Sequence, residues 1–229
     1  SDIAIGISRM LGFKLSTNFK RPYFASSFGD FWKRWHISLS SWFRDYLYIP
    51  LGGNRVSKRR MTLNVMIVFL VSGLWHGASW NFVVWGALNG LFIIGLDPLL
   101  VNVLKKSGAL GRGLIALIVT TCWALSLAFF RAQTFADAAL VLQQIFAWSP
   151  VEAAVDSMSD SHHKLTVLLL LFLFFVEGVR ERWVNSVAWI LDAPRPIRWG
   201  AYLALIWGCI LIGVHGLQAE DKQFIYFQF

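Results

Sequence analysis

The first sixty residues carry a helical pattern of apolar and polar positions. Between residues 28 and 47, apolar side chains recur three or four positions apart, and the positions between them hold Lys33, Arg34, Ser38, Ser41 and Asp45. Ser27 precedes this pattern as a suitable N-cap, and Pro50 followed by two glycines should end it. The spacing therefore predicts one amphipathic helix from residue 28 to just before Pro50, which would lie in a membrane interface or line a partly polar cavity.

Beyond residue 60 the pattern changes to long apolar runs with few charges. A helix needs about 20 mostly apolar residues to cross the hydrocarbon core of a bilayer. Five runs approach or meet that length: 61–79, 80–104, 114–130, 165–179 and 199–217. Within the second run, Asp97-Pro98 should produce a kink or an early exit. We therefore expect an all-α, multi-pass membrane protein with about five transmembrane helices, preceded by an amphipathic or re-entrant helical segment over 1–60.

Composition and charge support this class and orient the chain. Hydrophobic residues make up 56% of it, charged residues 15%, and the mean hydropathy is +0.55. Residues 1–60 hold eleven Lys and Arg against three Asp and Glu, so the rest, with ten of each, has no net charge. Alternating the five spans places the basic loops on one side, which the positive-inside rule makes cytoplasmic, and the 131–164 loop outside. We expect contact with membrane lipid and none with nucleic acid.

One histidine interrupts the first apolar run, in 69-FLVSGLWHGASW-80. An ionisable side chain within a span is costly and is by default a functional hypothesis. Gly73 and Gly77 flank the Trp75-His76 pair, and such small residues let a neighbouring helix or a slim ligand approach the backbone. The residues alone leave two readings equally open: a packed histidine that bonds a neighbouring helix, or a group that does chemistry.

If His76 is functional, several chemistries are not suggested by the sequence. No serine stands in a GxSxG pattern, no two carboxylates share a helix face, and no phosphate-binding glycine motif occurs. His162 and His163 are adjacent in a polar stretch and do not define a metal site, so no metal is expected. A neutral imidazole in a poorly solvated site could still accept a proton from a hydroxyl, which suits transfer of an acyl group to an alcohol.

Two blocks of the chain, FWKRWHISLSSWFRDYLYIPLGGNR at 31–55 and GLWHGASWNFVVWGALNG at 73–90, resemble the membrane-bound O-acyltransferase (MBOAT) family. The resemblance is greatest to its bacterial polysaccharide O-acetylation branch, and the closing residues 224-FIYFQF-229 are similar to the end of that branch. Members of the family are considerably longer. The resemblance therefore implies that residues 1–229 are the C-terminal part of a single MBOAT membrane domain.

The resemblance also implies roles for particular residues. His76 matches the histidine that acts as general base, and His36 matches a second motif position that orients the donor or stabilises the developing oxyanion. Further residues of the two blocks are expected to line the substrate tunnel: Trp32, Trp35, Arg44, Asp45, Tyr46, Trp75 and Asn81. For Asn81, a hydrogen bond between helices is the favoured alternative.

The resemblance further implies an acyl thioester such as acetyl-CoA as donor, with no bound cofactor. An exopolysaccharide such as alginate would be the acceptor, reached through periplasmic partner proteins from the bacterial inner membrane. Three other functions stay open: a D-alanyl transferase of the teichoic-acid type, a non-catalytic membrane scaffold or conduit for periplasmic transferases, and, last, a proton-coupled transporter.

Overall fold

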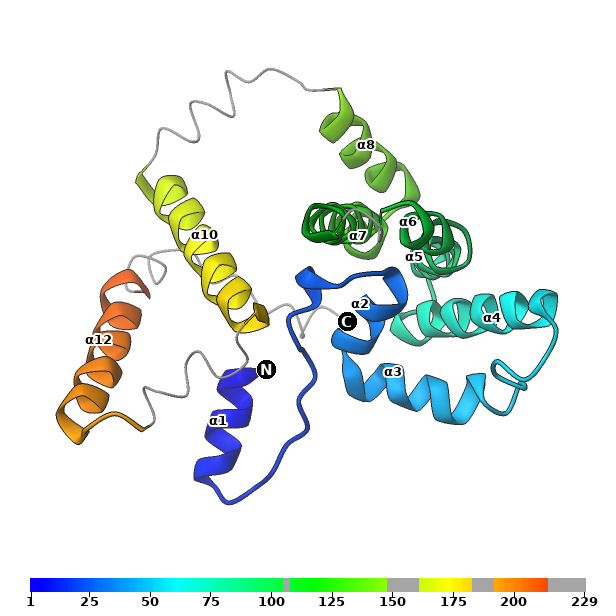
Figure 1. Cartoon of the computed structure of the whole chain (residues 1–229). Helices are drawn as coiled ribbons and strands as arrows, with labels where there is room; N and C mark the ends of the chain where they lie inside the picture. The colour runs from blue at the N-terminus through cyan, green and yellow to red at the C-terminus, as the bar shows by residue number, and fades with distance from the viewer. Residues whose placement is uncertain (105–107, 148–160, 183–191, 214–229) are drawn as a thin grey trace. The chain divides into compact units, whose positions relative to one another are not determined.

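A computed structural model describes residues 1–104, 108–147, 161–182 and 192–213 (Figure 1). Over these ranges the regular structure is entirely helical, which confirms the all-α prediction. The chain divides into two compact units, Ser1–Leu171 and Phe172–Phe229, and the site lies in the first. The closing residues 224–229 lie outside the described ranges.

The amphipathic segment is broken into short helices rather than forming one. The first unit begins with α1 (Asp2–Met10) and a 3-10 turn, η1 (Pro22–Phe24), and continues through α2 (Phe28–Arg34), α3 (Ile37–Phe43) and a π-turn, η2 (Arg44–Tyr48). The predicted cap is confirmed, because the Ser27 side chain accepts from the backbone N–H of Asp30. The prediction of a single helix is wrong: Trp35 is extended and His36 is left-handed, so the helix ends and restarts there.

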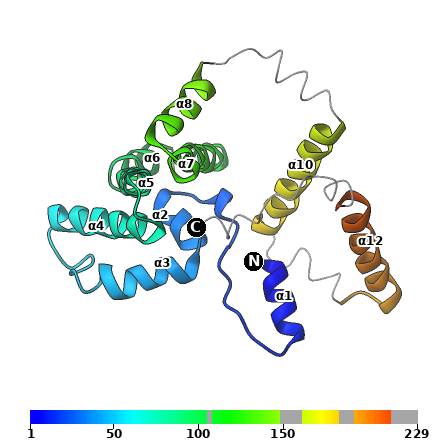
Figure 2. The same ribbon diagram turned by 180° about the vertical axis from the view of Figure 1, so that it is seen from behind.

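Two close-packed helices form the scaffold behind the site. α4 (Lys58–His76) is followed after three residues by α5 (Trp80–Leu91), and the two pack against each other (Figures 1 and 2). Glycine makes the approach possible. A Cβ added at Gly73 would lie 2.2 Å from the backbone oxygen of Phe82, and one at Gly86 would lie 2.3 Å from that of Phe69. Larger residues at these positions would push the two backbones apart.

The second apolar run continues beyond α5 without a break. A π-turn, η3 (Phe92–Leu96), leads directly into α6 (Asp97–Leu104). Of the two outcomes expected at Asp97-Pro98, the early exit is therefore wrong, and the kink stays a prediction. The π-turn just before Pro98 lets the helix continue although proline cannot donate a backbone hydrogen bond.

α7 (Gly108–Arg131) crosses the core, and α8 (Phe135–Phe146) packs on it. The expectation of a loop over 131–164 is wrong for 135–146, and also for 161–164, where α10 (Ser161–Arg182) begins. Thr134 and Asp137 form a capping box that starts α8. Residues 148–160 lie outside the described ranges.

Two of the helical runs are long and apolar enough to cross a membrane: Trp80–Asn102 and Gly108–Arg131. They correspond to the second and third predicted spans. The other three predicted runs fall largely in α4, α10 (Ser161–Arg182) and α12 (Arg195–Gly213), with 214–217 outside the described ranges. The structure thus supports a helical membrane protein, and the number of five spans stays a prediction.

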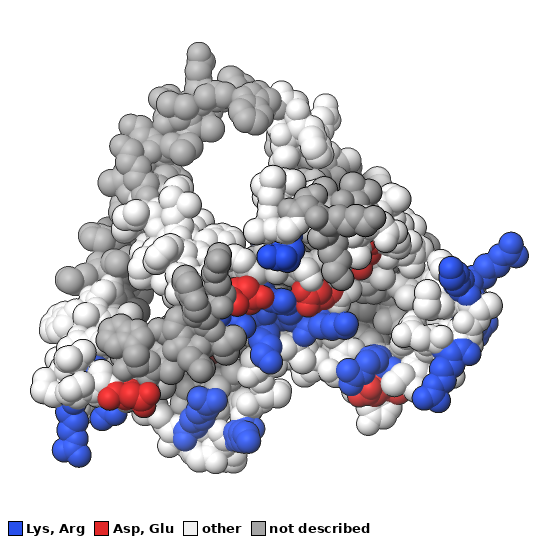
Figure 3. Space-filling view, in the orientation of Figure 1, with Lys and Arg blue, Asp and Glu red and all other residues white. Residues whose placement is uncertain are grey.

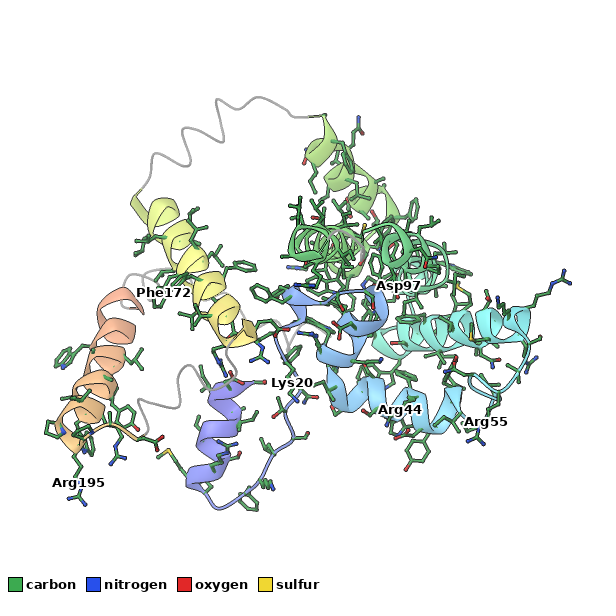
Figure 4. All side chains as sticks on the ribbon, viewed as in Figure 1. Lys20, Arg44, Arg55, Asp97, Phe172 and Arg195 are labelled. Atoms are coloured by element: carbon green, nitrogen blue, oxygen red, sulfur yellow. The ribbon has the colours of Figure 1, made fainter. Side chains whose placement is uncertain are left out.

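The core of the first unit joins the amphipathic segment to these helices. Phe28 and Phe31 of α2 are fully buried against Ile115, Val119 and Trp123 of α7. At the start of α2, Asp97 accepts hydrogen bonds from the backbone N–H groups of Phe28 (2.7 Å) and Gly29 (3.1 Å). Figure 4 shows Asp97 beside α2. The apolar face of α2 therefore packs on protein, and α6 caps its N-terminus.

Candidate active site

His76 is the last residue of α4 and lies in an aromatic surround. Its ring centroid is 4.9 Å from that of Phe130, 5.2 Å from that of Trp85 and 6.3 Å from that of Phe82. The surround is built by α4, α5 and α7, and it leaves the imidazole only partly exposed. Gly77 ends the helix beside the Phe82 ring, so the chain turns at once into α5.

His36 lies at the break between α2 and α3, in a backbone conformation that few residues adopt. Its φ of 45° and ψ of 55° are left-handed, an uncommon state for a residue other than glycine. Asn18 holds this state: its carbonyl accepts from the backbone N–H of Ile37 (2.9 Å), and its side-chain oxygen accepts from that of Ser38 (2.9 Å). The Phe19 ring stacks on the imidazole at 6.3 Å. Backbone strain maintained by surrounding contacts is typical of functional sites.

The fold brings the two histidines together from separate elements. A continuous series of ring contacts runs from His36 through Phe19, Trp35, Phe31, Trp32 and Trp85 to His76. Partial burial lowers the pKa of His36 below its ordinary value of 6.5. At neutral pH His36 is therefore mostly uncharged and can accept a proton.

Trp32 and Trp35 belong to the series of ring contacts between the two histidines. Trp32 lies edge-on to Trp85, with centroids 5.9 Å apart, and Trp85 contacts His76. Trp35 packs on Trp123 at 4.5 Å and stacks on Phe31 at 5.7 Å. Both predicted lining residues are thus partly buried in the ring cluster between the histidines, and their role in the tunnel stays a prediction.

The predicted trio Arg44, Asp45 and Tyr46 lies elsewhere. These residues are exposed on η2, where Arg44 forms an ion pair with Asp45 (2.7 Å) and lowers the pKa of that carboxyl. Figure 4 shows Arg44 on this stretch, on the way to Arg55, and Figure 3 shows Lys and Arg side chains gathered over the connection that follows.

The chain that follows the trio contacts α4 far from His76. Shortly after η2, the carbonyl of Leu51 accepts from the Asn64 side chain of α4 (3.0 Å). Asn64 is twelve residues from His76, about 18 Å at 1.5 Å of helix rise per residue. Among the described residues the trio makes no hydrogen bond, ion pair or ring contact with either histidine, and its role in the tunnel stays a prediction.

The other two predicted lining residues differ from each other. The Trp75 ring touches that of His76 at 4.9 Å, but the side chain is 59% exposed. Asn81 is buried, and its side-chain amide donates to the carbonyl of Ala132 just after α7 (2.9 Å). In this structure Asn81 therefore makes the hydrogen bond between helices that was the alternative to a lining role.

Three further features of the site have only weak signals in the sequence or none. Asn18 and Asp97 hold α2 and His36 through contacts 20 and 69 positions apart in the chain, which no local pattern reveals. In addition, three tryptophans have a buried indole N–H group that finds no hydrogen-bond partner among the described residues: Trp32, Trp85 and Trp123. A tryptophan-rich sequence indicates aromatic packing, and only coordinates can show that the donors are unpaired.

Comparison with protein families places these elements in a known group. Residues 1–99 match the model of MBOAT, the membrane-bound O-acyltransferase family. The match therefore includes both histidines, the break at Trp35-His36 and the hairpin of α4 and α5.

Individual relatives extend the match along the chain. A probable alginate O-acetylase of Pseudomonas putida is 32% identical over 250 aligned residues, which cover 100% of this chain and 49% of the relative. A peptidoglycan O-acetyltransferase of Helicobacter pylori is 41% identical, over 62% of this chain and 27% of its own. A teichoic acid D-alanyltransferase of Streptococcus thermophilus is 36% identical, over 41% of this chain and 24% of its own. The chain spans less than half the length of each.

Proposed function

Because the chain belongs to the membrane-bound O-acyltransferase family, we propose that it carries the histidine centre of an enzyme that transfers an acetyl group to a polysaccharide hydroxyl. The observation that carries this proposal is the pairing of His36 and His76. Two imidazoles from separate elements are joined by one series of ring contacts, within an aromatic surround. A purely structural histidine at the end of α4 would not need a second imidazole held nearby in a left-handed backbone conformation.

In the proposed mechanism the donor and the acceptor react directly. The neutral imidazole of His76 accepts the proton of an acceptor hydroxyl as the oxygen attacks the carbonyl carbon of an acyl thioester. The carbon–sulfur bond then breaks, the thiolate leaves, and it takes up the proton from His76. His36 orients the donor beside this centre. Trp32 and Trp35 limit the access of water, which would otherwise compete as the attacking hydroxyl.

We assign the donor to the acyl thioesters, with acetyl-CoA as the first candidate, and the acceptor to exopolysaccharides such as alginate. The names of the O-acetylase relatives support an acetyl group and a polysaccharide-type acceptor. We further propose a bacterial inner-membrane location with a multi-pass topology. Periplasmic partner proteins would pass the acetyl group onward. The two long apolar runs in the described residues support the membrane location.

The decisive variant is His76→Ala in the complete protein. We expect loss of at least about 100-fold in acetylation, because removing a general base costs about two to four orders of magnitude. The measurement is the acetyl content of the exopolysaccharide, with protein abundance in the membrane as control. Acetylation near the wild-type level at normal abundance would show that His76 is structural and that the scaffold function is correct.

The match to a D-alanyltransferase supports one second candidate. A D-alanyl transferase would use the same histidine pair with an aminoacyl thioester on a carrier protein. Mass spectrometry of the polymer made with and without the protein separates the two, because an acetyl group and a D-alanyl group add different masses.

A further inference from the structure

The unpaired indole donors beside the histidine pair need an explanation. A buried tryptophan normally donates its indole hydrogen to an acceptor, because an unpaired buried donor is unfavourable. Trp32 of α2, Trp85 of α5 and Trp123 of α7 have no such acceptor among the described residues. They belong to one connected set of rings around His36 and His76. Of such donors, one that lies beside the reacting groups is available to an acceptor that a substrate supplies.

Trp85 is the best placed of the three for the reaction. It is 4% exposed, and its ring is perpendicular to that of His76 (89°) with centroids 5.2 Å apart. The backbone that carries it is firmly held. Gly86 packs directly on the backbone of α4, and the Asn89 side chain donates to the Trp85 carbonyl (2.8 Å). The indole is therefore rigid, dehydrated and adjacent to the proposed base.

The other two indoles are less well placed. Trp123 is equally buried (7% exposed), but its close ring neighbours include Trp35 and Phe31 on the His36 side. Trp32 is only partly buried and reaches His76 through Trp85. Trp123 therefore serves as a matched control: a buried indole with an unpaired donor in the same ring cluster, in contact with different groups.

We propose that the indole N–H of Trp85 donates a hydrogen bond to the carbonyl oxygen of the acyl thioester and stabilises the oxyanion formed from it. This inference rests on the proposed function. As the acceptor oxygen attacks the carbonyl carbon, the carbonyl π electrons move to the carbonyl oxygen, and His76 holds the hydroxyl proton. When the oxyanion collapses, the carbonyl reforms, the carbon–sulfur bond breaks, and the leaving thiolate takes the proton from His76. The N–H of Trp85 remains intact throughout.

The test compares Trp85→Phe with Trp123→Phe in the complete protein, purified in detergent and supplied with acetyl-CoA and an oligosaccharide acceptor. Each change keeps an aromatic ring and removes the N–H group. For Trp85→Phe we expect kcat to fall about 100-fold or more with little change in KM for the thioester, since loss of one oxyanion donor has an effect of about that size. Trp123→Phe should retain most of the wild-type kcat.

A third variant separates the donor from the shape of the indole. Benzothienylalanine at position 85, introduced by an expanded genetic code, has a bicyclic ring of the same shape with sulfur in place of N–H. It should reproduce the kcat loss of Trp85→Phe at an unchanged thermal unfolding temperature.

Wild-type kcat in the benzothienylalanine protein would overturn the inference and leave the proposed function intact, because the N–H would then lie against an aromatic face without a catalytic role. Trp85→Phe and Trp123→Phe variants with equal kcat would overturn it as well. Wild-type protein that transfers no acyl group to any hydroxyl would instead contradict the proposed function.

Discussion

At the scale of single residues, the site depends on how the imidazole of His36 is held. Its backbone is left-handed, and Asn18 keeps it so with two hydrogen bonds. Partial burial disfavours the charged ring and lowers its pKa below 6.5. The unfolded chain therefore binds more protons than the folded chain in the window just below pH 6.5.

We predict from this that stability falls with acidity in that window. The contribution of His36 to the free energy of unfolding is fully present above pH 6.5 and is lost as the pH drops through the lowered pKa of the folded chain. The slope of this contribution is less than about 1.4 kcal/mol per pH unit, because one ring takes up at most one proton, and solvent screening of the partly exposed ring reduces it further. Thermal unfolding of wild type and His36→Asn between about pH 7.5 and pH 5.5 measures it. Asparagine tolerates the left-handed backbone and does not titrate, so the variant should lose less stability. Equal losses would contradict the prediction.

At the scale of elements, the position of α2 determines the position of His36. α2 packs on α7 through Phe28 and Phe31, and Asp97 of α6 accepts from two backbone N–H groups at its N-terminus. A helix of seven residues has little stability of its own, so these tertiary contacts determine whether it forms.

We predict that Asp97→Ala destabilises the first unit by about 1–3 kcal/mol, the usual cost of leaving buried backbone donors unpaired. The loss should also reach the site, since α2 carries Trp32 and leads to His36. Urea or thermal unfolding measures the first effect, and acyl transfer per folded protein measures the second.

Asp137→Ala is the matched control for Asp97→Ala. It removes a carboxylate that caps α8 locally, through Thr134, with no bond to α2. Transfer per folded protein should stay near wild type in this variant. If Asp97→Ala and Asp137→Ala reduced transfer equally, the tether of α2 to α6 would have no special role in the site.

At the scale of the whole molecule, the long apolar runs determine how the chain relates to a membrane. Trp80–Asn102 and Gly108–Arg131 are each of spanning length, and they are joined by a short connection that contains Lys105 and Lys106. Two consecutive spans return the chain to the side from which it started.

The distribution of Lys and Arg predicts that residues 107 and 133 face opposite sides of the membrane, with 107 cytoplasmic. Ser107→Cys and Gln133→Cys, each in a background with Cys122 and Cys209 replaced by alanine, test this with a membrane-impermeant thiol reagent on intact cells. Only the cysteine at 133 should react from outside. The cysteine at 107 should react after the membrane is opened. Labelling of both from outside would show that Gly108–Arg131 does not span.

The helical class, the membrane location and both histidines could be predicted from the sequence, because they depend on local properties. Runs of apolar residues, helical periodicity and a capping serine act over a few neighbours, and the two motif blocks are themselves continuous in the chain. The same local reasoning was wrong to predict an unbroken helix through Trp35-His36 and an early exit at Asp97-Pro98. There the outcome depends on Asn18 at one break and on a π-turn inside a packed helix at the other.

By itself, then, the amino-acid sequence determined the kind of protein, and through its two motif blocks it singled out His36 and His76 as the candidate site residues. Only the tertiary structure joined His36 to His76 through ring contacts, left Arg44, Asp45 and Tyr46 exposed on η2, and revealed unpaired indole donors in the ring cluster. The physical reason is range. Solvation and helix propensity are properties of a residue and its near neighbours, whereas the pairing of a donor or a charge depends on groups that only folding brings close.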